Sequence, residues 1–131
     1  EIQAEIQAVL GDSMGEMFAY YAAADLAFIG GSLLPYGGQN LIEACAVGTP
    51  VLVGPHMHNF AEATRLAVAA GAAAQVQNSG ELVMELQRLL DNPDALREMR
   101  QRCAGFVESN RGATDKSLQL IASLYKPKSG E

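Results

Sequence analysis

Short apolar runs alternate with helical patterns along the chain, and this alternation constrains the possible fold most strongly. The apolar runs cover residues 6–10, 26–29, 50–55 and 72–76, and Gly, Pro or Asp lies beside most of them. Their length and composition are typical of buried strands. Strands that alternate with helices form parallel sheets through right-handed crossovers. The sequence therefore predicts an α/β fold: a doubly wound, Rossmann-like parallel sheet with flanking helices.

Polar residues at recurrent positions indicate where the helices begin. In a capping box, Ser, Thr, Asp or Asn is followed three residues later by Glu, and the two side chains satisfy free amides. Pro also favours the first helical position. These signals, with Gly48 and Gly71 as helix ends, predict helices that start at Ser13 (with Glu16), Asn40 (with Glu43), Asn59 (with Glu62), Asn78 (with Glu81) and Asn92-Pro93, followed by a last helix from about Gly112 to Tyr125. The helix after Asn92 should bury Leu96, Met99, Cys103 and Phe106, and the one before it Leu82, Val83, Leu86, Leu89 and Leu90.

Composition limits the class of protein further. The chain has 131 residues, enough for one domain with a real core, and 49% of them are hydrophobic. A net charge of −6 argues against nucleic-acid binding, which needs clustered Lys and Arg. No apolar run approaches the ~20 residues of a membrane span, and Cys45 and Cys103 are expected to be buried free thiols. The start without Met and the small number of strands suggest a fragment of a longer protein.

The run GGSLLPYGGQN, residues 30–40, is the strongest candidate for a binding loop. It follows a predicted strand and precedes a predicted helix, where parallel sheets bind ligands. Gly37 and Gly38 would let a phosphate approach the amides of Gln39 and Asn40. A purely structural loop remains an equal alternative, because the run is neither a P-loop nor a dinucleotide fingerprint.

Glu43 and the two histidines each allow more than one interpretation. Glu43 could cap the helix at Asn40, or it could hold the hydroxyls of a ribose. His56 and His58 resemble a metal pair, but two ligands fall short of the three or four of a zinc site. We therefore expect no metal and no cofactor.

Three blocks in fixed order carry a resemblance to a known family. They are Gly-Asp-Ser-Met-Gly-Glu at 11–16, the glycine run at 30–40, and Gly-Pro-His-Met-His-Asn-Phe at 54–60. Together they resemble the C-terminal half of bacterial 3-deoxy-D-manno-octulosonic acid (Kdo) transferases, which are GT-B glycosyltransferases of lipopolysaccharide synthesis. Gln39 stands where His is common and Ala44 where Pro is common. Gln still donates a hydrogen bond but cannot titrate, so an acid role is doubtful at that position.

This resemblance implies a donor-binding domain of a Kdo transferase. The family moves Kdo from CMP-Kdo to a lipid A precursor at the cytoplasmic face of the inner membrane. The catalytic base would then lie in an N-terminal acceptor domain that residues 1–131 do not include, so the chain alone should transfer nothing. By the resemblance, the residues that bind the donor nucleotide are Gly37, Gly38, Gln39 and Asn40 on the phosphate, Glu43 on the ribose, Gly31 and Ser32 beside them, Ser13, Met14, Gly15 and Glu16 at one border, and Pro55, His56, Asn59 and Phe60 at the far wall.

Two other functions fit parts of the sequence. A non-catalytic receiver module is also α/β and acidic, but Asp12 and Asp25 are misplaced for it and no Lys follows a late strand. Another GT-B enzyme or a nucleotide-sugar epimerase would share the fold and the ribose-binding Glu, and would use a UDP-sugar. The number of Kdo units, the acceptor variant and the oligomeric state do not follow from the sequence. A dimer that covers an open sheet edge is a conjecture.

Overall fold

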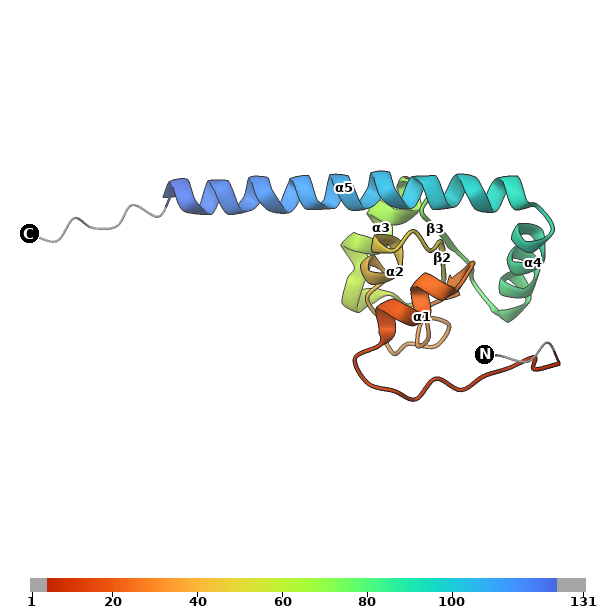
Figure 1. The fold of residues 1–131 in the computed structure, drawn as a ribbon. Helices are drawn as coiled ribbons and strands as arrows, with labels where there is room; N and C mark the ends of the chain where they lie inside the picture. The colour runs from red at the N-terminus through yellow and green to blue at the C-terminus, as the bar shows by residue number, and fades with distance from the viewer. Residues whose placement is uncertain (1–4, 125–131) are drawn as a thin grey trace, which may run out of the picture.

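A computed structural model describes residues 5–124 and contains a three-stranded parallel sheet (Figure 1). The strands lie in the order β1-β2-β3, with Ala27 paired to Val51 and Val51 paired to Ala73. The predicted parallel α/β architecture is therefore confirmed. The strands are β1 (Ala27–Phe28), β2 (Val51–Val53) and β3 (Ala73–Gln75).

Helices connect the strands and extend beyond the last one. The longest, α5, packs against α2, α3 and α4, and Figure 1 shows it running across the domain and past it. The helices are α1 (Met17–Ala23), α2 (Ile42–Ala46), the 3-10 turn η1 (His58–Phe60), α3 (Ala61–Ala69), α4 (Ser79–Leu90) and α5 (Pro93–Leu124). No helix within residues 5–124 is long and apolar enough to cross a lipid bilayer.

The predicted strand at 6–10 is wrong. Residues 6–10 have no regular structure and are all exposed, so the described sheet has three strands rather than four. A strand needs a neighbour to pair with its backbone groups, and none within the described residues pairs with this segment. Its apolar side chains alone do not make it a strand.

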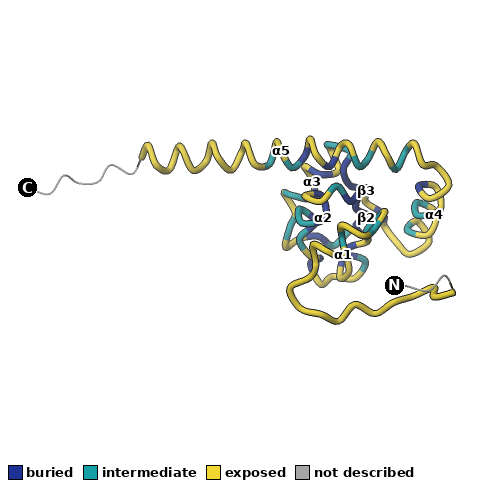
Figure 2. The backbone as a smooth tube through the Cα atoms, viewed as in Figure 1, coloured by how far each residue is buried: buried dark blue, intermediate teal, exposed yellow. Residues whose placement is uncertain are grey.

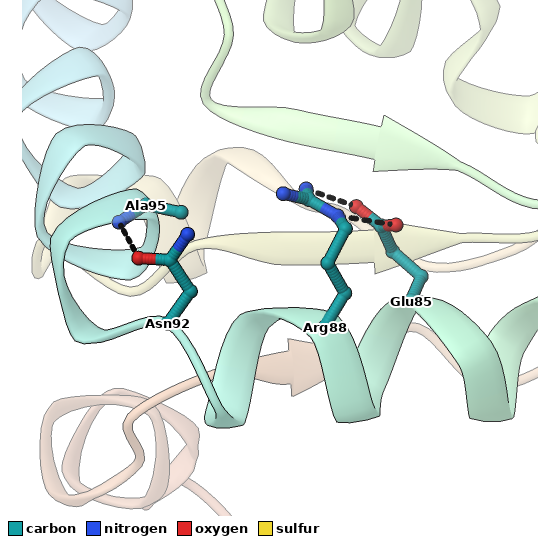
Figure 3. A network of polar contacts seen from close by, with 4 residues as sticks. All are labelled: Glu85, Arg88, Asn92 and Ala95. Carbon is teal, nitrogen blue, oxygen red and sulfur yellow. Dashed lines mark hydrogen bonds and ion pairs between the residues drawn. The ribbon is translucent and has the colours of Figure 1, made fainter.

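Two of the predicted helix starts are confirmed. The Asn78 side chain accepts a hydrogen bond from the Glu81 amide at 2.9 Å, and α4 begins at the next residue. Asn92 accepts one from the Ala95 amide at 3.2 Å at the start of α5, where Pro93 is the first residue (Figure 3). The ion pair Arg88–Glu85, 2.6 Å, lies on the preceding helix.

The other three predicted capping boxes are wrong. The hydroxyl of Ser13 bonds the Glu16 carboxylate at 2.8 Å instead of an amide, and α1 begins only at Met17. Asn40 accepts from the Ile42 amide at 3.0 Å, so α2 begins at Ile42. Asn59 lies in η1 and α3 begins at Ala61 without a side-chain cap. The Ser13 and Asn40 side chains form other local bonds instead, and the Asn59 side chain donates to the distant Tyr36 carbonyl at 3.5 Å.

The last helix was predicted to begin near Gly112, but α5 continues through that residue without a break. A single glycine within a helix costs about 1 kcal/mol relative to Ala, which long helices tolerate. Figure 2 shows that the distal part of α5, residues 111–124, is exposed throughout. The predicted end at Tyr125 lies outside the described residues.

The hydrophobic core lies between the sheet and helices α2, α3 and α5. It includes Ile29, Val51, Val53, Cys45 and Phe106, each no more than 3% exposed. Both cysteines are buried and free, as expected. Of the inward positions predicted on α4, Leu89 is buried, but Val83 and Leu90 are about 60% exposed, because α4 packs on α5 with one narrow stripe.

Candidate functional site

The loop between β1 and α2, residues 30–41, turns back on itself through glycines. Gly31, Gly37 and Gly38 have φ angles of 71°, 93° and 72°, in the left-handed region that other residues rarely adopt. The Gly38 amide donates to the Gly31 carbonyl at 3.1 Å and closes the loop. The loop follows the carboxyl end of β1, which is the edge where parallel sheets bind ligands.

A second segment, residues 54–60, follows β2 and packs on this loop. A side-chain carbon on Gly37 would collide with Asn59, and one on Gly38 would collide with the Met57 sulfur. The Asn59 amide donates to the Gly37 carbonyl at 3.2 Å. The double glycine therefore accommodates protein side chains, which supports a packing role for Gly37 and Gly38 themselves. A ligand would bind at the residues that follow them.

The amides after the double glycine are the part of the loop that is open to a ligand. Gln39 is exposed and Asn40 half-buried, and no residue within 5–124 accepts a hydrogen bond from either amide. Asn40 is held in place because its side chain accepts from the Ile42 amide. Two neighbouring, unpartnered amides can donate hydrogen bonds to the oxygens of one anion, such as a phosphate.

Glu43 lies in the first turn of α2, half-buried, directly after these amides. The charge of Glu43 acts on Tyr21 of α1. Burial raises the pKa of the Tyr21 phenol, and the charge of Glu43 raises it further. No residue within 5–124 donates a hydrogen bond to the carboxylate. Glu43 is therefore available to accept hydrogen bonds from hydroxyls of a ligand.

The segment Ser13–Glu16 is less closely tied to the loop. All four of its residues are exposed, with Met14 at 95%, and Gly15 has a φ of 79°. Within the described residues, no hydrogen bond joins this segment to residues 30–41. The structure thus brings together the glycine loop, Glu43 and the segment 54–60, but not residues 13–16.

A cavity of about 520 Å³ lies on α3 and the segment 54–60. The hydroxyl of Thr64, at its wall, is buried and has no hydrogen-bond partner among residues 5–124. Sequence reasoning missed the contribution of α3 and β3, because their residues are dispersed along the chain. The cavity is lined by Pro55, His56, Met57, His58, Ala61, Thr64, Arg65, Val68 and Gln75. No group of three possible metal ligands occurs in residues 5–124.

The fold and this pair of loops define a class of protein. Residues 1–105 match the family described as glycosyl transferases group 1, and the chain belongs to that family. The three strands with their helices are a GT-B-like α/β arrangement.

Within the family, the relatives are named as Kdo transferases, which confirms the resemblance found in the sequence. The chain is 46% identical over 116 residues to the 3-deoxy-D-manno-octulosonic acid transferase of Bordetella pertussis, covering 88% of the chain and 27% of that protein. It is 38% identical over 123 residues to the enzyme of the same name from Haemophilus influenzae, covering 92% and 28%. The chain thus spans about a quarter of the length of these relatives.

A solved structure agrees with the same assignment. The C-terminal CMP-Kdo binding domain of WaaA from Acinetobacter baumannii superposes with a TM-score of 0.69. The two chains are 30% identical, and the match covers 74% of this chain and 51% of the other.

Proposed function

We propose that this chain is the donor-binding domain of a Kdo transferase, and that the longer protein moves Kdo from CMP-Kdo to a lipid A precursor. The observation that carries the proposal is the pair of unpartnered amides, Gln39 and Asn40, beside the half-buried Glu43. The likeness to a domain whose structure is described as CMP-Kdo binding supports CMP-Kdo as the ligand of those groups.

Different residues would bind different parts of the donor. The Gly37-Gly38 turn exposes the amides of Gln39 and Asn40 to the CMP phosphate, and Glu43 accepts hydrogen bonds from the ribose hydroxyls. Gly31 shapes the floor of the site. The far wall is formed by Pro55, His56, Asn59 and Phe60. The place of Ser13, Met14, Gly15 and Glu16 at the opposite border rests on the family resemblance alone, because no hydrogen bond within residues 5–124 joins them to the loop.

The chemistry follows from where charge develops. When the bond between Kdo and the phosphate oxygen breaks, negative charge grows on the departing CMP. Fixed amide donors stabilise that charge more than they stabilise the substrate, by on the order of 3 kcal/mol for each well-placed donor. Gln39 adds a neutral donor and no proton, so the phosphate leaves as an anion stabilised by hydrogen bonds.

The remaining parts of the reaction belong to the longer protein. We propose that residues 1–131 act as a single donor-binding unit, and that a separate N-terminal domain binds the lipid A precursor and supplies the base. We also propose that the reaction takes place at the cytoplasmic face of the bacterial inner membrane, where the family resemblance puts the lipid acceptor. The alternative, a UDP-sugar enzyme of the same fold, differs in the base that the site accepts.

A thermal-shift titration of the intact transferase with CMP tests the proposal. Ligand that binds the folded protein stabilises it by RT ln(1 + [L]/Kd), about 2.7 kcal/mol at a hundredfold excess over Kd. We expect CMP to raise the melting temperature of the wild type and Glu43→Ala to lose most of that shift.

The matched control is Glu108→Ala, which removes an exposed carboxylate on α5 that pairs with Arg111. It should keep the full CMP shift. A shift with UDP and none with CMP would reject the Kdo assignment in favour of a UDP-sugar enzyme.

A further inference from the structure

Ser32, the residue after the first glycine pair, is completely buried, and its hydroxyl both donates and accepts a hydrogen bond within the protein. The hydroxyl donates to the Ile29 carbonyl at 2.5 Å, and it accepts from the Gly54 amide at 2.9 Å. Its exposed fraction is 0%. A ligand in the loop therefore cannot reach this hydroxyl, although the residue lies in the candidate donor site.

The two bonds of the hydroxyl join the carboxyl ends of two strands. Ile29 directly follows β1, and Gly54 directly follows β2. A third bond strengthens the same junction, because the Ser32 carbonyl accepts from the His56 amide at 2.9 Å. Ser32 thus fixes the start of the glycine loop against the start of the segment 54–60.

The junction also depends on the absence of a side chain at Gly54. A carbon added there would collide with the Ser32 carbonyl group and with the Leu33 amide, all of them backbone atoms. Backbone cannot rotate away as a flexible side chain can. The chain therefore needs glycine at 54 for the approach that the Ser32 bonds stabilise.

We propose that Ser32 is a positioning residue for donor binding, and that it acts through Gly54 and His56 rather than by touching the donor. It holds the glycine loop and the segment 54–60 at a fixed separation, so that Gln39 and Asn40 on one side and Asn59 on the other face the same ligand. This inference rests on the proposed function, because that function identifies the ligand as the CMP-Kdo donor.

The test compares steady-state kinetics of the intact transferase with Ser32→Ala, at a temperature well below the melting point of each protein. The variant leaves the Gly54 amide and the Ile29 carbonyl without their buried partner, which loosens the junction. We expect the KM for CMP-Kdo to rise about tenfold or more. The KM for the lipid acceptor should stay within about twofold, since the three bonds of Ser32 join residues of the donor site.

Two further variants keep the result interpretable. Ser32→Cys retains a weak donor and acceptor of similar size, and should recover part of the donor affinity even if Ser32→Ala folds poorly. Ser117→Ala is the matched control, because it also removes a serine hydroxyl that donates one hydrogen bond, to the Ala113 carbonyl at 3.0 Å, but on the exposed part of α5. It should leave both KM values unchanged.

The outcomes separate this inference from the proposed function. An unchanged donor KM in both Ser32→Ala and Ser32→Cys, with CMP-Kdo still used by the wild type, overturns the positioning role and leaves the proposed function intact. An equal rise of the donor and acceptor KM values also overturns it, because that pattern indicates general destabilisation. A wild type that does not use CMP-Kdo overturns both.

Discussion

Gly37 and Gly38 have two properties that no other residue type combines: a positive φ and space for a neighbouring side chain. Both are buried, and the side chains of Asn59 and Met57 occupy the space where their own would lie. The glycine pair therefore serves the packing of one loop on another. The open amides are those of the next two residues, so packing and ligand binding belong to adjacent positions.

Substitution of Gly38 should show this at the level of stability. Gly38→Ala forces alanine into the left-handed region, which costs about 1–2 kcal/mol, and it also displaces the Met57 sulfur. We expect the free energy of unfolding to fall by at least that amount. Chemical denaturation with urea, at constant slope, measures it.

Gly112→Ala is the matched control for this change. Gly112 lies within α5, and an added carbon there meets no atom within 4 Å. Because Ala is the better helix former, this variant should be stabilised by up to about 1 kcal/mol. Equal effects of the two substitutions would show that the conformation of the loop does not depend on Gly38.

At the scale of elements, α5 has two parts with different neighbours. Phe106 is 3% exposed and packs in the core, whereas Ile121 is 63% exposed. Phe106→Ala should therefore cost about 3–5 kcal/mol, because it removes buried apolar surface and leaves a cavity. Ile121→Ala should change the free energy of unfolding by no more than about 0.5 kcal/mol. Calorimetric melting of both variants measures the difference, and a large loss in Ile121→Ala would contradict the exposure of the distal part.

The sequence predicts the elements well where the signal is local and complete. Asn78 and Asn92 cap α4 and α5 as expected, since each side chain accepts from the amide three residues on. Asn40 and Ser13 match the same pattern but form other bonds, to the Ile42 amide and the Glu16 carboxylate. Pattern alone cannot decide between such bonds, since the choice depends on how the flanking loop is held.

The candidate site is predictable in part for the same reason. The glycine run indicated a loop at the carboxyl end of a strand, and the structure agrees. That Ser32 is buried, and that Met57 and Asn59 fill the glycine pair, depends on contacts between segments about twenty residues apart. Periodicity and capping signals describe neighbours in sequence and contain no information on such contacts.

At the scale of the whole molecule, the two thiols report on the integrity of the core. Cys45 on α2 and Cys103 on α5 are both buried in the same cluster, at no more than 1% exposure. The adjacent Cys103 thiol and burial raise the pKa of the Cys45 thiol, which disfavours the reactive thiolate.

Because both side chains are buried, we expect neither thiol to react with an aromatic disulfide reagent at pH 8 while the protein is folded. Both should react at one common rate, that of global opening, and immediately in denaturant. Absorbance of the released thiolate measures this. Fast reaction of one cysteine alone in the folded protein would instead reveal a local opening of the helix that carries it.

The unbroken α5 has a mechanical consequence. It contains 32 residues, and the 17 that follow Val107 extend for about 25 Å at 1.5 Å per residue. If this part of α5 stays straight, a tilt of about 10° at Val107 moves its far end by about 4 Å. The displacement of a fluorescent label near Leu124 would thus report rearrangements around Phe106 that are too small to measure directly.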